Sequence, residues 1–81
     1  MLIQVLGPGC SRCKTLYETV NQAVRETGTD AQVEKVEDIQ KIMTFDLLMT
    51  PGLVIDGQVK VGGRVPGLDE VKKLLLAAKA G

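Results

Sequence analysis

The chain has 81 residues, of which 10 are basic and 10 acidic, so its formal net charge is zero. A chain of this length is expected to form one domain, 1–81, in which every apolar face is needed for the core. The balanced charge argues against nucleic acid or an anionic membrane as the main partner, because both select basic surfaces. No apolar run reaches the roughly 20 residues of a membrane-spanning helix, and the first residues lack the pattern of an export signal. We therefore expect a cytoplasmic protein.

Histidine is absent, and the cysteines are Cys10 and Cys13. The lack of histidine excludes Ser-His-Asp and Cys-His catalysis and imidazole-based zinc sites. Chemistry therefore has to come from sulfur or carboxylates. A disulfide between two cysteines so close in sequence would close a very small loop, so a purely stabilising role is not expected.

The first predicted element is a strand over residues 1–6, an apolar run that ends at Gly7-Pro8-Gly9. A helix follows over residues 11–27, because apolar residues repeat at helical spacing until Gly28, which fits a left-handed C-cap. The turn between these elements brings Cys10 to the start of the helix.

A weaker strand pattern covers residues 31–36, and Asp38 then fits the N-cap of a short helix over 39–45. Residues 53–55 and 58–61 predict a hairpin, because Asp56-Gly57 supplies the positive φ angles of a tight two-residue turn.

The last predicted helix starts at Leu68, after Gly62-Gly63 interrupts the preceding strand, and continues to the end of the chain. The element order is therefore βαβαββα. Two crossover units give parallel strands and the hairpin adds an antiparallel edge, which predicts an α/β fold with a four-stranded mixed sheet and helices on both faces.

The segment Cys10-Ser11-Arg12-Cys13 is a Cys-X-X-Cys motif in the first turn of the predicted helix. Unpaired N–H groups and the positive end of the helix dipole favour a thiolate there, so Cys10 is expected to be the attacking sulfur. Arg12 places a further positive charge beside the motif, unless its guanidinium is simply solvated.

Other interpretations of the two cysteines remain open. They fit two incidental small core residues, or half of a soft-metal site. A carrier would hold Cu(I) or Zn through the two thiolates, with further ligands from a partner or a second copy. Small carriers with this motif have the order βαββαβ, which ends in a strand. A redox-sensing adaptor, whose disulfide changes the binding of one partner without turnover, is a third possibility.

The Cys-X-X-Cys motif at a helix start, Thr50-Pro51 before an Asp-Gly hairpin, and Gly62-Gly63 before the last helix occur together. In these features the chain resembles the thioredoxin and glutaredoxin superfamily. It is most similar to the small, glutaredoxin-sized redox-active disulfide proteins of archaea and bacteria. The resemblance implies a thioredoxin-like fold and a thiol–disulfide oxidoreductase that needs no cofactor and no metal.

The resemblance implies that Cys10 attacks a substrate disulfide and that Cys13 then resolves the mixed disulfide. The active-site loop would also include Gly9, Ser11 and Arg12.

By the same resemblance, the bond before Pro51 is cis, and Thr50 offers backbone hydrogen bonds to an extended substrate. From the residues alone, Pro51 also fits an ordinary trans proline at a strand start. The implied partners are a disulfide-containing protein and an electron donor such as a thioredoxin-reductase-like enzyme, and the protein is expected to be a monomer.

Three positions and one acidic pair depart from the superfamily patterns. Gln4 stands where thioredoxins have a buried aspartate, and Gly9 stands where they have a tryptophan. Gly7 replaces the lysine that glutaredoxins use to hold glutathione, and the acidic pair Asp69-Glu70 is displaced from the double glycine. Glutathione binding is therefore not carried over, and another base than residue 4 would have to serve Cys13.

Overall fold

The computed structural model describes residues 1–9, 11–45 and 49–80. Its elements in chain order are β1 (Leu2–Leu6), α1 (Ser11–Thr27), β2 (Gln32–Val36), α2 (Ile39–Ile42), β3 (Gly52–Ile55), β4 (Gln58–Gly62) and α3 (Leu68–Ala80). The predicted order βαβαββα is confirmed. Within the described ranges, no helix is both long and apolar enough to cross a membrane.

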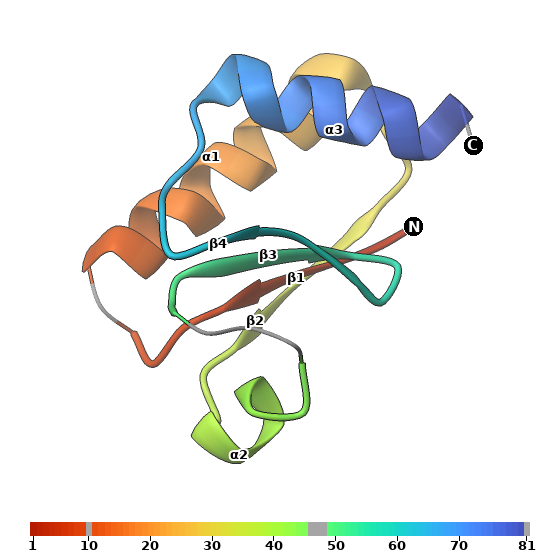
Figure 1. Cartoon of the computed structure of the whole chain (residues 1–81). Coiled ribbons are helices and arrows are strands. Elements are labelled where there is room, and N and C mark those ends of the chain that lie inside the picture. The colour runs from red at the N-terminus through yellow and green to blue at the C-terminus, as the bar shows by residue number, and fades with distance from the viewer. Residues whose placement is uncertain (10, 46–48, 81) are drawn as a thin grey trace.

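The four strands form one mixed sheet in the order β2-β1-β3-β4 (Figure 1). β1 pairs with β2 in parallel, and β3 pairs antiparallel with both β1 and β4. The parallel pair follows from the crossover through α1, whereas the tight turn between β3 and β4 requires an antiparallel pair. The carboxyl ends of β1 and β2 therefore lie at the same edge of the sheet.

The sheet has an apolar core on each face. Neighbouring residues of a strand point to opposite faces, so Val5 contributes to the core under α1 and α3, and Leu6 contributes to the core under α2. Figure 1 shows α1 and α3 on one side of the sheet and α2 on the other. Among the described residues, the buried members of the smaller core are Leu6, Val36, Ile42 and Val54. The prediction of helices on both faces is confirmed.

The second helix is shorter than predicted. Asp38 is its N-cap, as expected, and its carboxylate accepts a hydrogen bond of 2.9 Å from the N–H of Gln40. However, α2 ends at Ile42 instead of residue 45. The N–H groups of Thr44 and Phe45 bond to carbonyls three residues back, those of Lys41 at 3.0 Å and Ile42 at 3.1 Å. This tighter i→i+3 pattern ends the α-helix.

The Asp56-Gly57 turn joins the hairpin as predicted. Asp56 has φ 49° and Gly57 has φ 83°, both in the left-handed region that this turn requires. Asp56 also holds the start of β1, because its N–H donates to the Leu2 carbonyl and its carboxylate accepts from the Leu2 N–H, both at 2.8 Å. The turn thus connects two distant parts of the chain.

Two adjacent leucines of α3 test the main core. Leu75 is 0% exposed and Leu76 is 51% exposed. Replacing Leu75 with Ala should lower the free energy of unfolding by about 2–5 kcal/mol, because a buried side chain is lost and a cavity remains. Leu76→Ala, the matched control, should change it by about 0.5 kcal/mol or less. Urea unfolding measures both values, and similar losses in the two variants would contradict this packing.

An ion pair between α1 and α3 predicts a dependence of stability on pH. Nζ of Lys72 lies 2.5 Å from the Glu26 carboxylate. Hydrogen bonds from Lys72 and Gln22 lower the pKa of Glu26 from its ordinary value of 4.5. A pKa lowered by folding contributes stability that is present above the unfolded value and is lost as pH falls through the folded value.

Glu26→Gln should therefore lose less stability than the wild type when pH falls below about 4.5, in urea unfolding repeated across this range. Glu18→Gln removes an exposed carboxylate from the same helix and should follow the wild-type profile. If the two variants gave the same profile, the ion pair would have no part in it.

Candidate active site

The turn after β1 places the start of α1 against the sheet. The N–H of Gly7 donates to the Val36 carbonyl at 2.9 Å, which fastens the turn to the end of β2. Gly7 is buried, whereas Pro8 and Gly9 are exposed, and Gly9 has a φ of 91° that favours glycine. Cys10, the expected attacking sulfur, lies outside the described residues.

Cys13 is buried in the first turn of α1, with 6% of its surface exposed, and it is disulfide-bonded. Its sulfur packs against Gly7. A Cβ at position 7 would collide with Sγ of Cys13 and would lie 2.9 Å from its Cβ. Glycine is therefore required at this position, where the resemblance leads one to look for a lysine. Ser11 and Arg12, the other expected loop residues, are exposed at the start of the helix.

Arg12 connects α1 to two other segments of the site. Its Nη2 donates to the Gly63 carbonyl at 3.0 Å, and the N–H of Gly63 donates to the Pro51 carbonyl at 2.9 Å. The Thr50–Pro51 peptide bond is cis, Pro51 is fully buried and Thr50 is half-buried. The structure thus brings together Arg12, Thr50-Pro51 and the double glycine. Arg12 is exposed, and its guanidinium is held by this one hydrogen bond to a carbonyl.

An exposed methionine borders this group of residues. Met49 is 65% exposed, and a Cβ at Gly63 would lie 3.2 Å from its Cβ. Gly63 has a φ of 80°, which also favours glycine. Sequence reasoning did not select Met49, although its position directly before Thr50 was the available signal.

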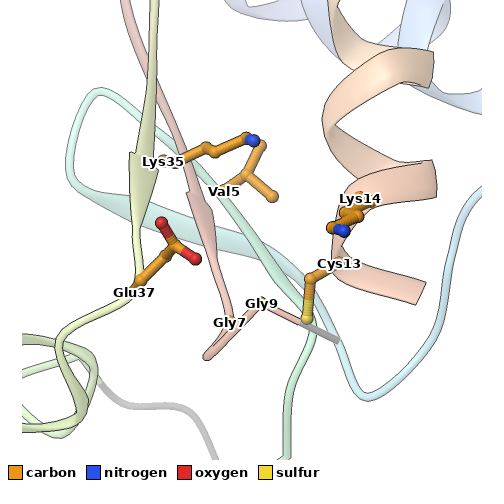
Figure 2. A pocket seen from close by; sticks show the side chains of 7 residues that line it. All are labelled: Val5, Gly7, Gly9, Cys13, Lys14, Lys35 and Glu37. Atoms are coloured by element: carbon orange, nitrogen blue, oxygen red, sulfur yellow. The ribbon is translucent and has the colours of Figure 1, made fainter. Parts of the chain in front are cut away.

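A cavity of about 30 Å³ lies beside Cys13. Figure 2 shows the described residues that line it: Val5, Gly7, Gly9, Cys13, Lys14, Lys35 and Glu37. Three of them, Lys14, Lys35 and Glu37, are charged and were not selected from the sequence. Nζ of Lys35 lies 4.5 Å from the centre of the Tyr17 ring, a cation–π contact that joins β2 to α1.

The position of Glu37 follows from the topology. It comes directly after β2, whose carboxyl end lies next to that of β1 and hence next to the turn that leads to Cys13. Its Oε2 would lie 2.9 Å from a Cβ at Gly9, so the carboxylate packs against this turn. The parallel pairing of β1 with β2 was the signal from which Glu37 was predictable.

Gln4 lies on the other face of the sheet. It lines a hollow together with Val36, Lys41 and Phe45 near α2, and its side-chain amide lies 3.5 Å from the Glu34 carboxylate. Gln4 does not line the cavity beside Cys13.

Glu70, one member of the displaced acidic pair, is hydrogen-bonded to an arginine. Both carboxylate oxygens of Glu70 accept hydrogen bonds from Arg64, at 2.8 and 2.6 Å. These bonds lower the pKa of Glu70. The carboxylate is thus held by a side chain of the loop that follows β4.

A disulfide-bonded cysteine in the first turn of the helix after β1, within a β2-β1-β3-β4 sheet, is the arrangement of thioredoxin-like redox domains. Comparison with known proteins agrees. Residues 1–76 match the family described as a thioredoxin domain. A thioredoxin of Methanothermobacter thermautotrophicus is 41% identical over 75 residues, which cover 93% of this chain and 97% of that protein.

Two further archaeal proteins are similar to the chain. A thioredoxin of Methanocaldococcus jannaschii is 36% identical over 75 residues, covering 93% of this chain and 86% of its own length. A probable thioredoxin of Methanothermobacter marburgensis is 33% identical over 68 residues, which cover 80% of this chain and 79% of that protein. The chain belongs to the thioredoxin family, and the expected class of activity, a thiol–disulfide oxidoreductase, is confirmed.

The contact between Gly7 and Cys13 predicts a coupled effect of two substitutions. Gly7→Ala should lower the free energy of unfolding by roughly 1–3 kcal/mol, because the new methyl group overlaps the sulfur. In a Cys13→Ala background the sulfur is gone, so the same substitution should cost less.

Urea unfolding of the four proteins under reducing conditions completes this double-mutant cycle, with a coupling of about 1 kcal/mol expected. Equal costs of Gly7→Ala in both backgrounds would show that the sulfur does not pack against residue 7.

Proposed function

We propose that the chain reduces disulfides of protein partners through Cys10 and Cys13. The Cys10 thiolate attacks one sulfur of the substrate disulfide, a Cys10–substrate bond forms, and the other substrate sulfur leaves with the electron pair and takes up a proton. The Cys13 sulfur then attacks Cys10, forming the Cys10–Cys13 disulfide and releasing the second substrate thiol. The substrate gains two electrons and the dithiol loses them.

The observation that carries this proposal is the placement of Cys13. Its sulfur is in a disulfide, buried against Gly7 in the first turn of α1. A buried second sulfur fits the resolving role, because it reacts within the complex and has no need to meet the substrate first. The family membership of the chain supports the same assignment.

We further propose that an extended segment of the partner binds along Thr50 and Pro51, with Gly9, Ser11 and Arg12 forming the loop beside it. The exposed side chain of Met49 adds an apolar contact there. A thioredoxin-reductase-like enzyme would return the dithiol to its reduced state. The reducing cytoplasm is where such a cycle would run, with the protein acting as a monomer of one domain, 1–81, and without a cofactor or metal.

The soft-metal carrier is not proposed here. The βαββαβ order of such carriers ends in a strand, whereas α3 is the last element of this fold. A redox-sensing adaptor would use the same two cysteines, and it differs from the proposed function in lacking turnover.

The test is the reduction of a model protein disulfide by dithiothreitol, with a chelator present. The wild type should accelerate it, Cys10→Ser should abolish the acceleration, and Cys13→Ser should accumulate a mixed disulfide visible by mass spectrometry. Lys73→Gln, at an exposed position of α3, is a control that should retain the reaction. The absence of acceleration by the wild type would overturn the proposal and favour an adaptor or a metal carrier.

A further inference from the structure

We propose that the Glu37 carboxylate accepts the proton of Cys13 when Cys13 resolves the mixed disulfide, and returns a proton to it when the disulfide is reduced. This inference rests on the proposed function, because it concerns the second step of that reaction. Glu37 directly follows β2 and lies outside the Cys-X-X-Cys motif.

The resolving step needs a route for a proton. The thiolate is the nucleophile in disulfide exchange, and an ordinary cysteine thiol has a pKa of about 8.5. Burial disfavours the charged form of a thiol further. Cys13 is 6% exposed, so bulk solvent has little access to its sulfur. The proton must therefore leave through a cavity that reaches the sulfur.

The cavity beside Cys13 is such an opening. Glu37 is its acidic residue, and the carboxylate and the sulfur both pack against the Gly7–Gly9 turn, Oε2 beside Gly9 and Sγ beside Gly7. In Figure 2 the carboxylate and the sulfur lie on opposite sides of this turn. Fastening of the turn to β2 by the Gly7–Val36 hydrogen bond keeps the two groups at the same edge of the sheet.

The size of the cavity suits a relay through one water molecule. A volume of about 30 Å³ is enough, since one water needs roughly 10–15 Å³ measured in this way. Such a water would find polar partners in the carboxylate and the thiol. The S–H proton passes to the water as a water proton passes to the carboxylate, while the sulfur electron pair forms the bond to Cys10. The bond between Cys10 and the substrate sulfur breaks at the same time, and the substrate sulfur leaves with its electron pair.

The charges around Glu37 favour this function. Lys14 of α1 and Lys35 of β2 line the same cavity. On the other side, Glu34, Asp38 and Lys41 line the neighbouring hollow with Glu37. Lys14 directly follows Cys13 on α1, and its positive charge on the cavity lining favours the thiolate that forms when the proton leaves. The Lys35 ammonium lies over the Tyr17 ring. Glu37 itself is exposed, so it can exchange the proton with solvent afterwards.

A two-phase reaction with 4,4′-dithiodipyridine isolates the step. This neutral disulfide releases one chromophore when Cys10 attacks it and a second when Cys13 resolves the mixed disulfide. The leaving group needs no proton, so the second phase reports proton loss from Cys13. Reduced wild type, Glu37→Gln and Glu34→Gln are each mixed with one equivalent of reagent between about pH 6 and pH 9.5, a range that spans the ordinary pKa of a thiol.

Glu37→Gln should slow the second phase by roughly tenfold near pH 7. It should approach the wild-type rate at the highest pH, where Cys13 loses its proton without help. The first phase should stay unchanged. Glu34→Gln is the matched control, because it removes the same charge from β2 three residues earlier, on the face near Gln4, and it should follow the wild type throughout.

Three results would overturn the inference: an equal second phase in Glu37→Gln and wild type, a faster one, or a slowing by the same factor at every pH, which would indicate a structural effect. The proposed function fails separately. If the wild type released no second chromophore, or if Cys13→Ser released two, the assignment of Cys13 as the resolving thiol would be wrong whatever Glu37 does.

Discussion

The packing of the Cys13 sulfur against Gly7 is the contact on which the site depends. It joins the first turn of α1 to the end of β1 at a point where no side chain at residue 7 fits. Because Gly7 also donates a hydrogen bond to Val36, the same residue fixes the turn to β2. The ends of β1 and β2 and the first turn of α1 therefore meet at one sulfur. This arrangement buries the sulfur of Cys13 and places Glu37 at the same end of the sheet.

The remaining parts of the site are joined by hydrogen bonds to main-chain carbonyls. Arg12 reaches the Gly63 carbonyl, and Gly63 in turn donates to Pro51, so the helix start, the loop after β4 and the cis-proline segment form one connected group. The apolar cores on both faces of the sheet hold in place the strands that carry these segments. Hydrogen bonds to main-chain carbonyls thus determine where these segments lie.

Local patterns were sufficient to predict most of the fold and the centre of the site. The Asp56-Gly57 turn, the apolar spacing of the two long helices and the Cys-X-X-Cys motif at a helix start each depend on residues close in sequence. The cis bond before Pro51 came from the resemblance, and the structure has one there. The short extent of α2 and the anchoring of Arg12 on Gly63 depend on hydrogen bonds that periodicity does not encode. Lys14, Lys35 and Glu37 were missed because they gather only once β1 and β2 pair, although the parallel pairing itself was predicted.

The central claim is that one sulfur attacks while the other, Cys13, remains buried until the mixed disulfide has formed. Brief alkylation of the reduced, folded protein with iodoacetamide, followed by peptide mass spectrometry, tests it most directly, with urea-unfolded protein as the control in which both thiols react. We expect the label to appear at Cys10 first and Cys13 to stay unmodified in the folded protein. Labelling of Cys13 as fast as Cys10, or before it, would contradict the assignment of Cys13 as the buried, resolving sulfur.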